Sequence, residues 1–171
     1  DSYALQLLAV ILTEGKASRL YQRMVEHEQS VTFVSAEYGE SYEPSLFHFR
    51  AEARGEHTAR EIEDSVFDEL ARIAEHGVTP QELDRAKHQI EAHFVLTRER
   101  TLDQAILIGQ IETLYGLSYI DTYLESIAGV TSEDISRVCG AYLCEHNRTV
   151  ATLIPDGAAD GEDESGEEPE E

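Results

Sequence analysis

The chain has 171 residues, a formal net charge of −22 at pH 7 and a hydrophobic fraction of 41%. This length accommodates one domain, and the composition excludes a collagenous, low-complexity or wholly disordered chain. The excess of acidic side chains repels phosphate backbones and anionic lipid headgroups, so nucleic acid and membrane surfaces are disfavoured as partners.

The first predicted elements are two helices, over residues 2–13 and 16–28, interrupted at Gly15. Apolar residues recur three and four positions apart in both segments. The apolar stretch 3–12 lacks a basic n-region and a small-residue cleavage site, and it is too short to span a bilayer. We therefore expect neither a signal peptide nor a membrane anchor, and the compartment stays open.

A β-hairpin is predicted next, from β-rich patterning over 31–38 and 46–53 and turn-forming residues between them. In the second strand, Phe47 and Phe49 alternate with His48 and Arg50. One face of the hairpin should therefore pack on the core while the other is polar.

Helical patterning returns after the hairpin, and four helix starts resemble capping boxes. These starts are Thr58…Glu61, Thr79…Glu82, Thr101…Gln104 and Thr131…Asp134. Gly77 should end the first helix, the second should run over about 80–98, and a short helix is expected over 118–128. Residues 149–154 are predicted to form a final strand. An antiparallel β-sheet with helices packed on it is an α+β fold, predicted here as one domain over 1–155.

The last sixteen residues, 156–171, contain nine acidic and no basic side chains, which leaves a net charge of −13 on residues 1–155. A segment with this composition is expected to be disordered. The acidity of the remainder has two interpretations, a halophile-like surface suited to concentrated salt or an ordinary acidic protein.

The seven histidines do not suggest a metal site. His88 and His93 are five apart, so a helix separates them by about 140° and they cannot chelate one ion. An inverted zinc motif would need His where Ala92 stands. The other histidines (His27, His48, His57, His76 and His146) are interpreted as isolated surface or capping groups. We therefore predict that the chain has no metal ligands.

No catalytic centre can be derived from the remaining motifs. Cys139 and Cys144 are too far apart on a helix to form a disulfide. The segment 15–18, Gly-Lys-Ala-Ser, lacks the upstream glycine of a phosphate loop.

Four segments do carry a family resemblance. Ser18-Arg19-Leu20-Tyr21 after a helix and a glycine resembles a signature of the pitrilysin/insulinase-like zinc metallopeptidases, which include mitochondrial processing peptidase. The segments 79–87, 130–135 and 149–155 resemble later parts of the same fold, in the same order. The resemblance covers about 1–155.

The resemblance implies a C-terminal, non-zinc domain of such a peptidase, incomplete at its N-terminus. The family's zinc motif, His-x-x-Glu-His, is not in this chain, so zinc is expected in the missing N-terminal part. The family's substrate-binding Arg and Tyr correspond by position to Glu26 and to Phe33, or to Thr32 if the alignment shifts by one. Both residue types are altered, and no residue of the chain is predicted to be catalytic.

The function expected from the resemblance is that of a C-terminal domain in a zinc-dependent metalloendopeptidase, which helps to enclose a peptide but is inactive alone. A non-proteolytic partner subunit of the same family and a stand-alone acidic binding module are the alternatives. Expected partners are an N-terminal zinc-binding half or partner subunit, and a peptide substrate. Self-association through an exposed sheet edge or face is a further expectation.

Overall fold

The computed structural model describes residues 1–39, 41, 43, 45–97 and 101–154. The elements are α1 (Ser2–Thr13), the π-helix η1 (Tyr21–His27), strands β1 (Val31–Tyr38) and β2 (Phe47–Ala53), helices α2 (Ala59–His76), α3 (Pro80–Leu96), α4 (Thr101–Leu114), α5 (Ser118–Gly129) and α6 (Ser132–Tyr142), and the 3₁₀ turn η2 (Glu145–Asn147). None of the described helices has the length and apolar character needed to cross a membrane.

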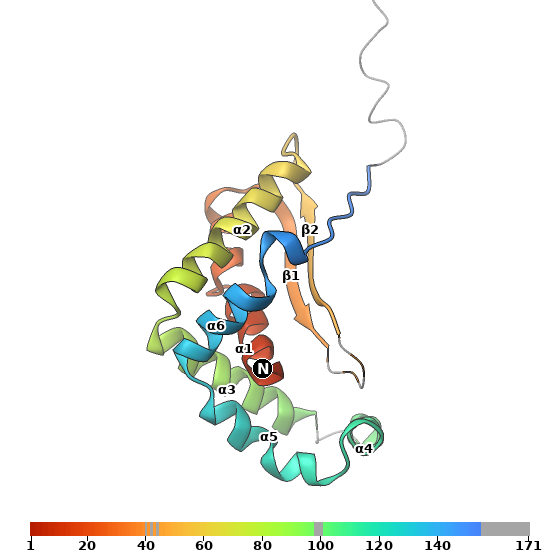
Figure 1. The fold of residues 1–171 in the computed structure, drawn as a ribbon. Helices are drawn as coiled ribbons and strands as arrows, with labels where there is room; N and C mark the ends of the chain where they lie inside the picture. Colours follow the sequence, from red (N-terminus) through yellow and green to blue (C-terminus); the bar gives the residue numbers. More distant parts are fainter. Residues whose placement is uncertain (40, 42, 44, 98–100, 155–171) are drawn as a thin grey trace, which may run out of the picture.

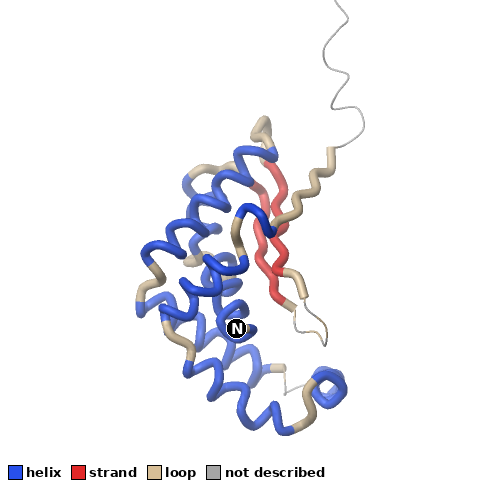
Figure 2. Tube along the Cα trace, viewed as in Figure 1, coloured by secondary structure: helices blue, strands red, loops and turns tan. Residues whose placement is uncertain are grey.

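Helix α1 is the centre of the core and contacts β1, α3, α5 and α6. Its Leu7, Leu8, Ile11 and Leu12 are fully buried, because apolar residues occupy most of its circumference. Figures 1 and 2 show helices α1, α2 and α6 on one side of the hairpin. The α+β fold, with helices packed on an antiparallel sheet, is confirmed.

The predicted hairpin is also confirmed, with β1 and β2 paired antiparallel. Ala36 lies opposite Phe49 and Tyr38 opposite Phe47, and these side chains belong to or pack against the buried cluster. The intervening residues alternate to the other face of the sheet, which is exposed and mostly polar.

Three of the predicted capping boxes are present as complete reciprocal pairs, at Thr58, Thr79 and Thr131. Helix α4 begins at Thr101, as expected, but residues 98–100 before it lie outside the described residues. Gly77 follows α2 with φ +74°, a left-handed conformation that favours glycine and ends the helix.

The prediction of a strand over 149–154 is wrong for the described structure, in which this segment pairs with no strand. Leu153 is 95% exposed and Ile154 is 67% exposed. A strand needs a neighbour to hydrogen-bond with, and in the described residues β1 and β2 pair only with each other. The acidic segment 156–171 lies outside the described residues.

The predicted helix 16–28 is present only in part and in a different form. Residues 14–18 make a turn, and 21–27 form a π-helix instead of an α-helix. A π-helix has hydrogen bonds between residues five apart, instead of four as in an α-helix. The Glu28 N–H donates such a bond to the Arg23 carbonyl oxygen.

Candidate functional site

The site is built from the signature residues that follow α1. Gly15 has φ +76°, and the buried Ser18 donates its hydroxyl hydrogen to the Gly15 carbonyl oxygen at 2.7 Å. Together they close a tight turn, which starts the next helix at Arg19 and buries Leu20 completely. The predicted break at Gly15 is therefore confirmed.

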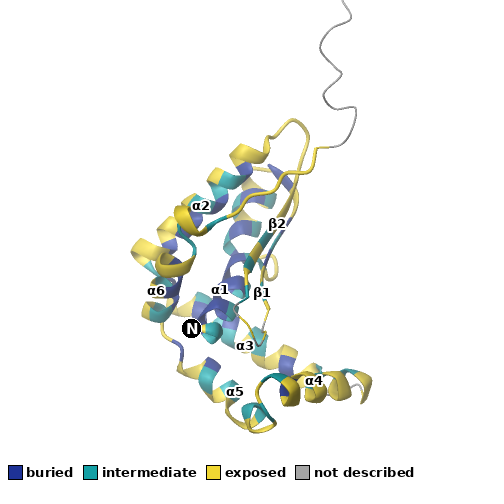
Figure 3. Ribbon diagram, turned by 45° about the vertical axis from the view of Figure 1, so that its right-hand side comes forward, coloured by how far each residue is buried: buried dark blue, intermediate teal, exposed yellow. Residues whose placement is uncertain are grey.

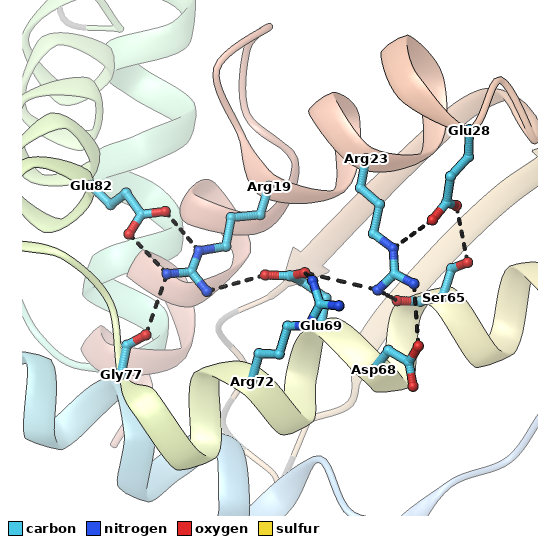
Figure 4. A network of polar contacts seen from close by, with 9 residues as sticks. All are labelled: Arg19, Arg23, Glu28, Ser65, Asp68, Glu69, Arg72, Gly77 and Glu82. Carbon is cyan, nitrogen blue, oxygen red and sulfur yellow. Dashed lines mark hydrogen bonds and ion pairs between the residues drawn. The ribbon is translucent and has the colours of Figure 1, made fainter.

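The Arg19 side chain joins three segments of the domain (Figure 4). Its Nε and Nη2 donate to the two carboxylate oxygens of Glu82 at 2.7 and 2.9 Å, a bidentate pair. Its Nη1 donates to Glu69 at 3.1 Å, and its Nη2 also reaches the Gly77 carbonyl oxygen at 3.3 Å. The hydrogen bonds from Arg19 hold the pKa of Glu82 down to about 2. One arginine thus fixes α2, α3 and the link between them against the signature helix.

Arg23, one turn later, repeats this arrangement toward the other end of α2 (Figure 4). It donates to Glu28 at 2.6 Å, to Asp68 at 3.2 Å and to the Ser65 carbonyl oxygen at 3.1 Å. The buried Glu69 lies between the two arginines, 3.9 Å from Arg23 Nη1. Arg19 of the signature and Arg23 after it therefore hold α2 and α3 against the segment that follows α1.

The predicted substrate positions lie beyond this network, where η1 leads into β1. Glu26 is exposed near the end of η1, and Gln29 has φ +52°, an uncommon conformation for a residue with a side chain. Phe33 is 51% exposed on β1, beside a bulge in the register at Thr32. The described contacts do not bring Glu26 and Phe33 together, but both side chains are solvent-accessible at the same connection.

Phe33 belongs to the exposed face of the hairpin. The pairs on that face are Phe33 with Glu52, Ser35 with Arg50 and Glu37 with His48. This face combines one aromatic ring with donors and acceptors of both charges. Such a surface can contact an extended peptide through its side chains.

A zinc site does not fit the described residues. They contain no group of three His, Cys, Asp or Glu side chains placed to hold a metal ion. Some of the histidines interpreted as isolated have partners: His146 Nε2 lies 3.5 Å from Cys144 Sγ, and His57 Nδ1 lies 3.3 Å from Glu61 Oε2. Both cysteines are free, and burial raises the pKa of the Cys139 thiol to about 11.

A groove that no sequence motif predicted lies between α1, α3, α4 and α5, with a volume of about 1120 Å³. Tyr119 and Tyr123 line one wall, with ring centroids 5.6 Å apart and the rings tilted by 40°. Tyr115, in the turn before α5, stacks on Tyr119 with ring centroids 4.6 Å apart. Tyr3, at the start of α1, stacks on Tyr119 at 6.2 Å. The four-residue spacing of Tyr119 and Tyr123 was a signal in the sequence that these two share one face of α5.

Comparison with known proteins gives a consistent result. A family model described as the peptidase M16 inactive domain matches residues 1–90. An uncharacterized zinc protease of Streptomyces coelicolor is 30% identical over 138 residues, which are 80% of this chain and 30% of that protein. The zinc protease PqqE of Helicobacter pylori is 23% identical over 91% of this chain and 35% of its own length. The chain thus spans about a third of these relatives.

Solved structures share the fold. A protease from Helicobacter pylori superposes with a TM-score of 0.79 at 23% identity, covering 84% of this chain and 35% of that one. An inactive peptidase domain from Bordetella parapertussis superposes with a TM-score of 0.77 at 19% identity, covering 92% of this chain and 86% of that one.

Proposed function

The chain belongs to the family of peptidase M16 inactive domains, and from this premise we propose that it works within a longer zinc metalloendopeptidase. The domain supplies no zinc ligand and instead forms part of the enclosure around the peptide. The observation that carries the proposal is the signature: Ser18, Arg19 and Leu20 build a rigid interior, and the polar face of the hairpin is left exposed. The zinc and its catalytic base belong to the N-terminal half.

We propose that peptide contacts include Glu26 and Phe33. Both side chains are exposed where η1 meets β1, and Phe33 lies on the mixed-charge face of the hairpin. The ring of Phe33 can pack on an extended peptide. The carboxylate of Glu26 can accept hydrogen bonds from basic side chains or from backbone N–H groups of the peptide.

The test uses the full-length protein, assayed for bound zinc and for cleavage of internally quenched peptides. We expect zinc and cleavage in the full-length protein and no cleavage by the 171-residue chain alone. Phe33→Ala should raise KM with little change in kcat, while the exposed Leu153→Ala serves as a matched control. A full-length protein without zinc or cleavage would overturn the proposal.

A non-proteolytic partner subunit is the second candidate. It is favoured by Glu26 and Phe33, where the family resemblance implies Arg and Tyr. A guanidinium can stabilise a polarised peptide carbonyl, whereas a carboxylate repels it. Restoring both residues with Glu26→Arg and Phe33→Tyr separates the candidates: peptide cleavage should rise in a working peptidase and stay absent in a non-proteolytic subunit.

Two further features belong to this proposal. The β1–β2 sheet has open edges among the described residues, and we propose that an edge pairs with a second copy of the chain. Sedimentation at several concentrations tests this self-association. The net charge of −22 supports adaptation to salt. The melting temperature should then rise as potassium chloride screens repulsion, with a Debye length of about 3 Å at 1 M. An unchanged melting temperature would contradict that adaptation.

A further inference from the structure

The inference concerns Arg85 and Gln89, which lie four residues apart on one face of α3. Figure 3 shows this helix beside the largely buried α1. Arg85 Nε, Arg85 Nη2 and Gln89 Oε1 are buried, and none of the three atoms has a hydrogen-bond partner among the described residues. A buried polar group without a partner is destabilising, and a charged one more so. These three atoms therefore indicate a binding site whose ligand supplies their partners.

Arg19 shows which group a guanidinium of this kind binds. Its Nε and Nη2 donate to the two carboxylate oxygens of Glu82 at 2.7 and 2.9 Å. In Arg85 the same two nitrogens are the buried ones without a partner among the described residues. They form one edge of the planar guanidinium, and that edge matches the spacing of two carboxylate oxygens. The ligand group that fits Arg85 is therefore a carboxylate.

Gln89 adds a requirement of the opposite kind. Its Oε1 can only accept hydrogen bonds, so the ligand must also carry a donor close to its carboxylate. The amide of Gln89 lies against the turn after α1, where a Cβ added at Gly15 would be 3.5 Å from Gln89 Nε2. The last residue of a peptide has both groups, because its terminal carboxylate and its backbone N–H are attached to the same Cα. A peptide C-terminus therefore matches Arg85 and Gln89 together.

The groove between α1, α3, α4 and α5 gives a peptide access to Gln89. Gln89 lines this groove, and Arg85 lies one helical turn, about 6 Å of rise, nearer the start of α3. The groove volume of about 1120 Å³ exceeds the roughly 300–1,000 Å³ typical of small-molecule pockets, and Val10, Phe94 and Ile106 are among the lining residues. A peptide in the groove is therefore expected to be apolar, with its last residue at Gln89.

We propose that Arg85 and Gln89 bind the C-terminal residue of a peptide that lies in this groove. Arg85 donates to the terminal carboxylate, and Gln89 accepts the hydrogen bond of the N–H on the same residue. The rest of the peptide carries few acidic side chains, because the net charge of −22 repels them. The inference rests on the proposed function in taking the ligand to be a peptide, and it adds which end of the peptide is recognised.

Fluorescence anisotropy of labelled peptides tests the site in the full-length protein, with zinc removed by a chelator so that no peptide is cleaved. An apolar peptide with a free C-terminal carboxylate is compared with the same peptide ending in an amide. We expect the amide to bind about tenfold more weakly, because it loses the charge-assisted pair with Arg85. Arg85→Gln should weaken binding of the free acid to the level of the amide. Arg60→Gln removes an exposed arginine of α2 and, as the matched control, should keep the tenfold difference.

A third peptide, amidated at its C-terminus but ending in Asp, identifies the source of the carboxylate. Binding as tight as that of the free acid would assign the site to a side chain and overturn the proposal. Equal binding of acid and amide, or no binding of either, would also overturn it.

Arg85→Lys is the second variant, used if Arg85→Gln does not fold. It keeps the charge but loses the bidentate edge, so most of the difference between acid and amide should disappear. Binding is measured without cleavage, so the two proposals fail separately. A protein that binds the free acid but cleaves no peptide after zinc is restored would overturn the proposed function alone.

Discussion

The arginine network beside α2 and the apolar arm formed by α4 are opposites in composition and in packing. In the network, Arg19 and Arg23 hold partly buried carboxylates through several hydrogen bonds each. In α4, apolar side chains such as Leu102 and Ile106 are largely exposed. The partners of the charged residues all lie within the described residues, whereas the apolar side chains of α4 are left exposed there.

The largest effect should come from removing Arg19. Arg19→Ala leaves the carboxylates of Glu69 and Glu82 without their main partner, and we expect the free energy of unfolding to fall by about 3 kcal/mol. Arg60→Ala is the matched control, because the exposed Arg60–Asp64 pair should contribute less than about 0.5 kcal/mol. Equal losses in urea denaturation of the two variants would show that the network does not hold the helices together.

Acid should weaken the arginine network. The pKa of Glu82 is lowered to about 2 in the folded chain, against 4.5 as its ordinary value. Because the folded pKa is depressed, the stabilisation is fully present above pH 4.5 and is lost as the pH falls toward 2. Denaturation at several pH values should show this slope in the parent chain, and Glu82→Gln should flatten it. An identical slope in the variant would assign the acid sensitivity to other carboxylates.

A smaller effect is expected at the start of α2. Thr58 accepts a hydrogen bond from the Glu61 backbone and completes a capping box. Thr58→Ala should lower the free energy of unfolding by about 1 kcal/mol, while Thr58→Ser should retain most of the stability. Thermal unfolding of the two variants compares them directly, and equal melting temperatures would contradict a capping role.

The smallest effect should be on α4 itself. Leu102→Gln removes an apolar side chain that is already 70% exposed, so the stability of the 171-residue chain should change by less than about 0.5 kcal/mol. The same change at a covered leucine would cost several times more. A large loss at Leu102 in denaturant titrations would mean that α4 is packed after all, and the contrast between the two regions would disappear.

The sequence by itself determined the elements whose signals are local. The capping boxes at Thr58, Thr79 and Thr131 identified helix starts, because each cap bonds within its own first turn. The alternation around Phe47 identified the packed face of the hairpin. The signature beginning at Ser18 was enough to suggest the family.

Only the tertiary structure decided what those elements do together. The partners of Arg19 are 50 and 63 residues away, and the groove needs four helices, so neither could be found from spacing along the chain. Glu26 and Phe33 came from resemblance alone and stay a prediction. The segment 149–154 has the composition of a strand, but pairing requires a neighbouring strand, and the described fold supplies none there. Short sequence patterns predict where a helix or strand forms. Contacts between residues far apart in the sequence decide whether that element is paired, buried or exposed.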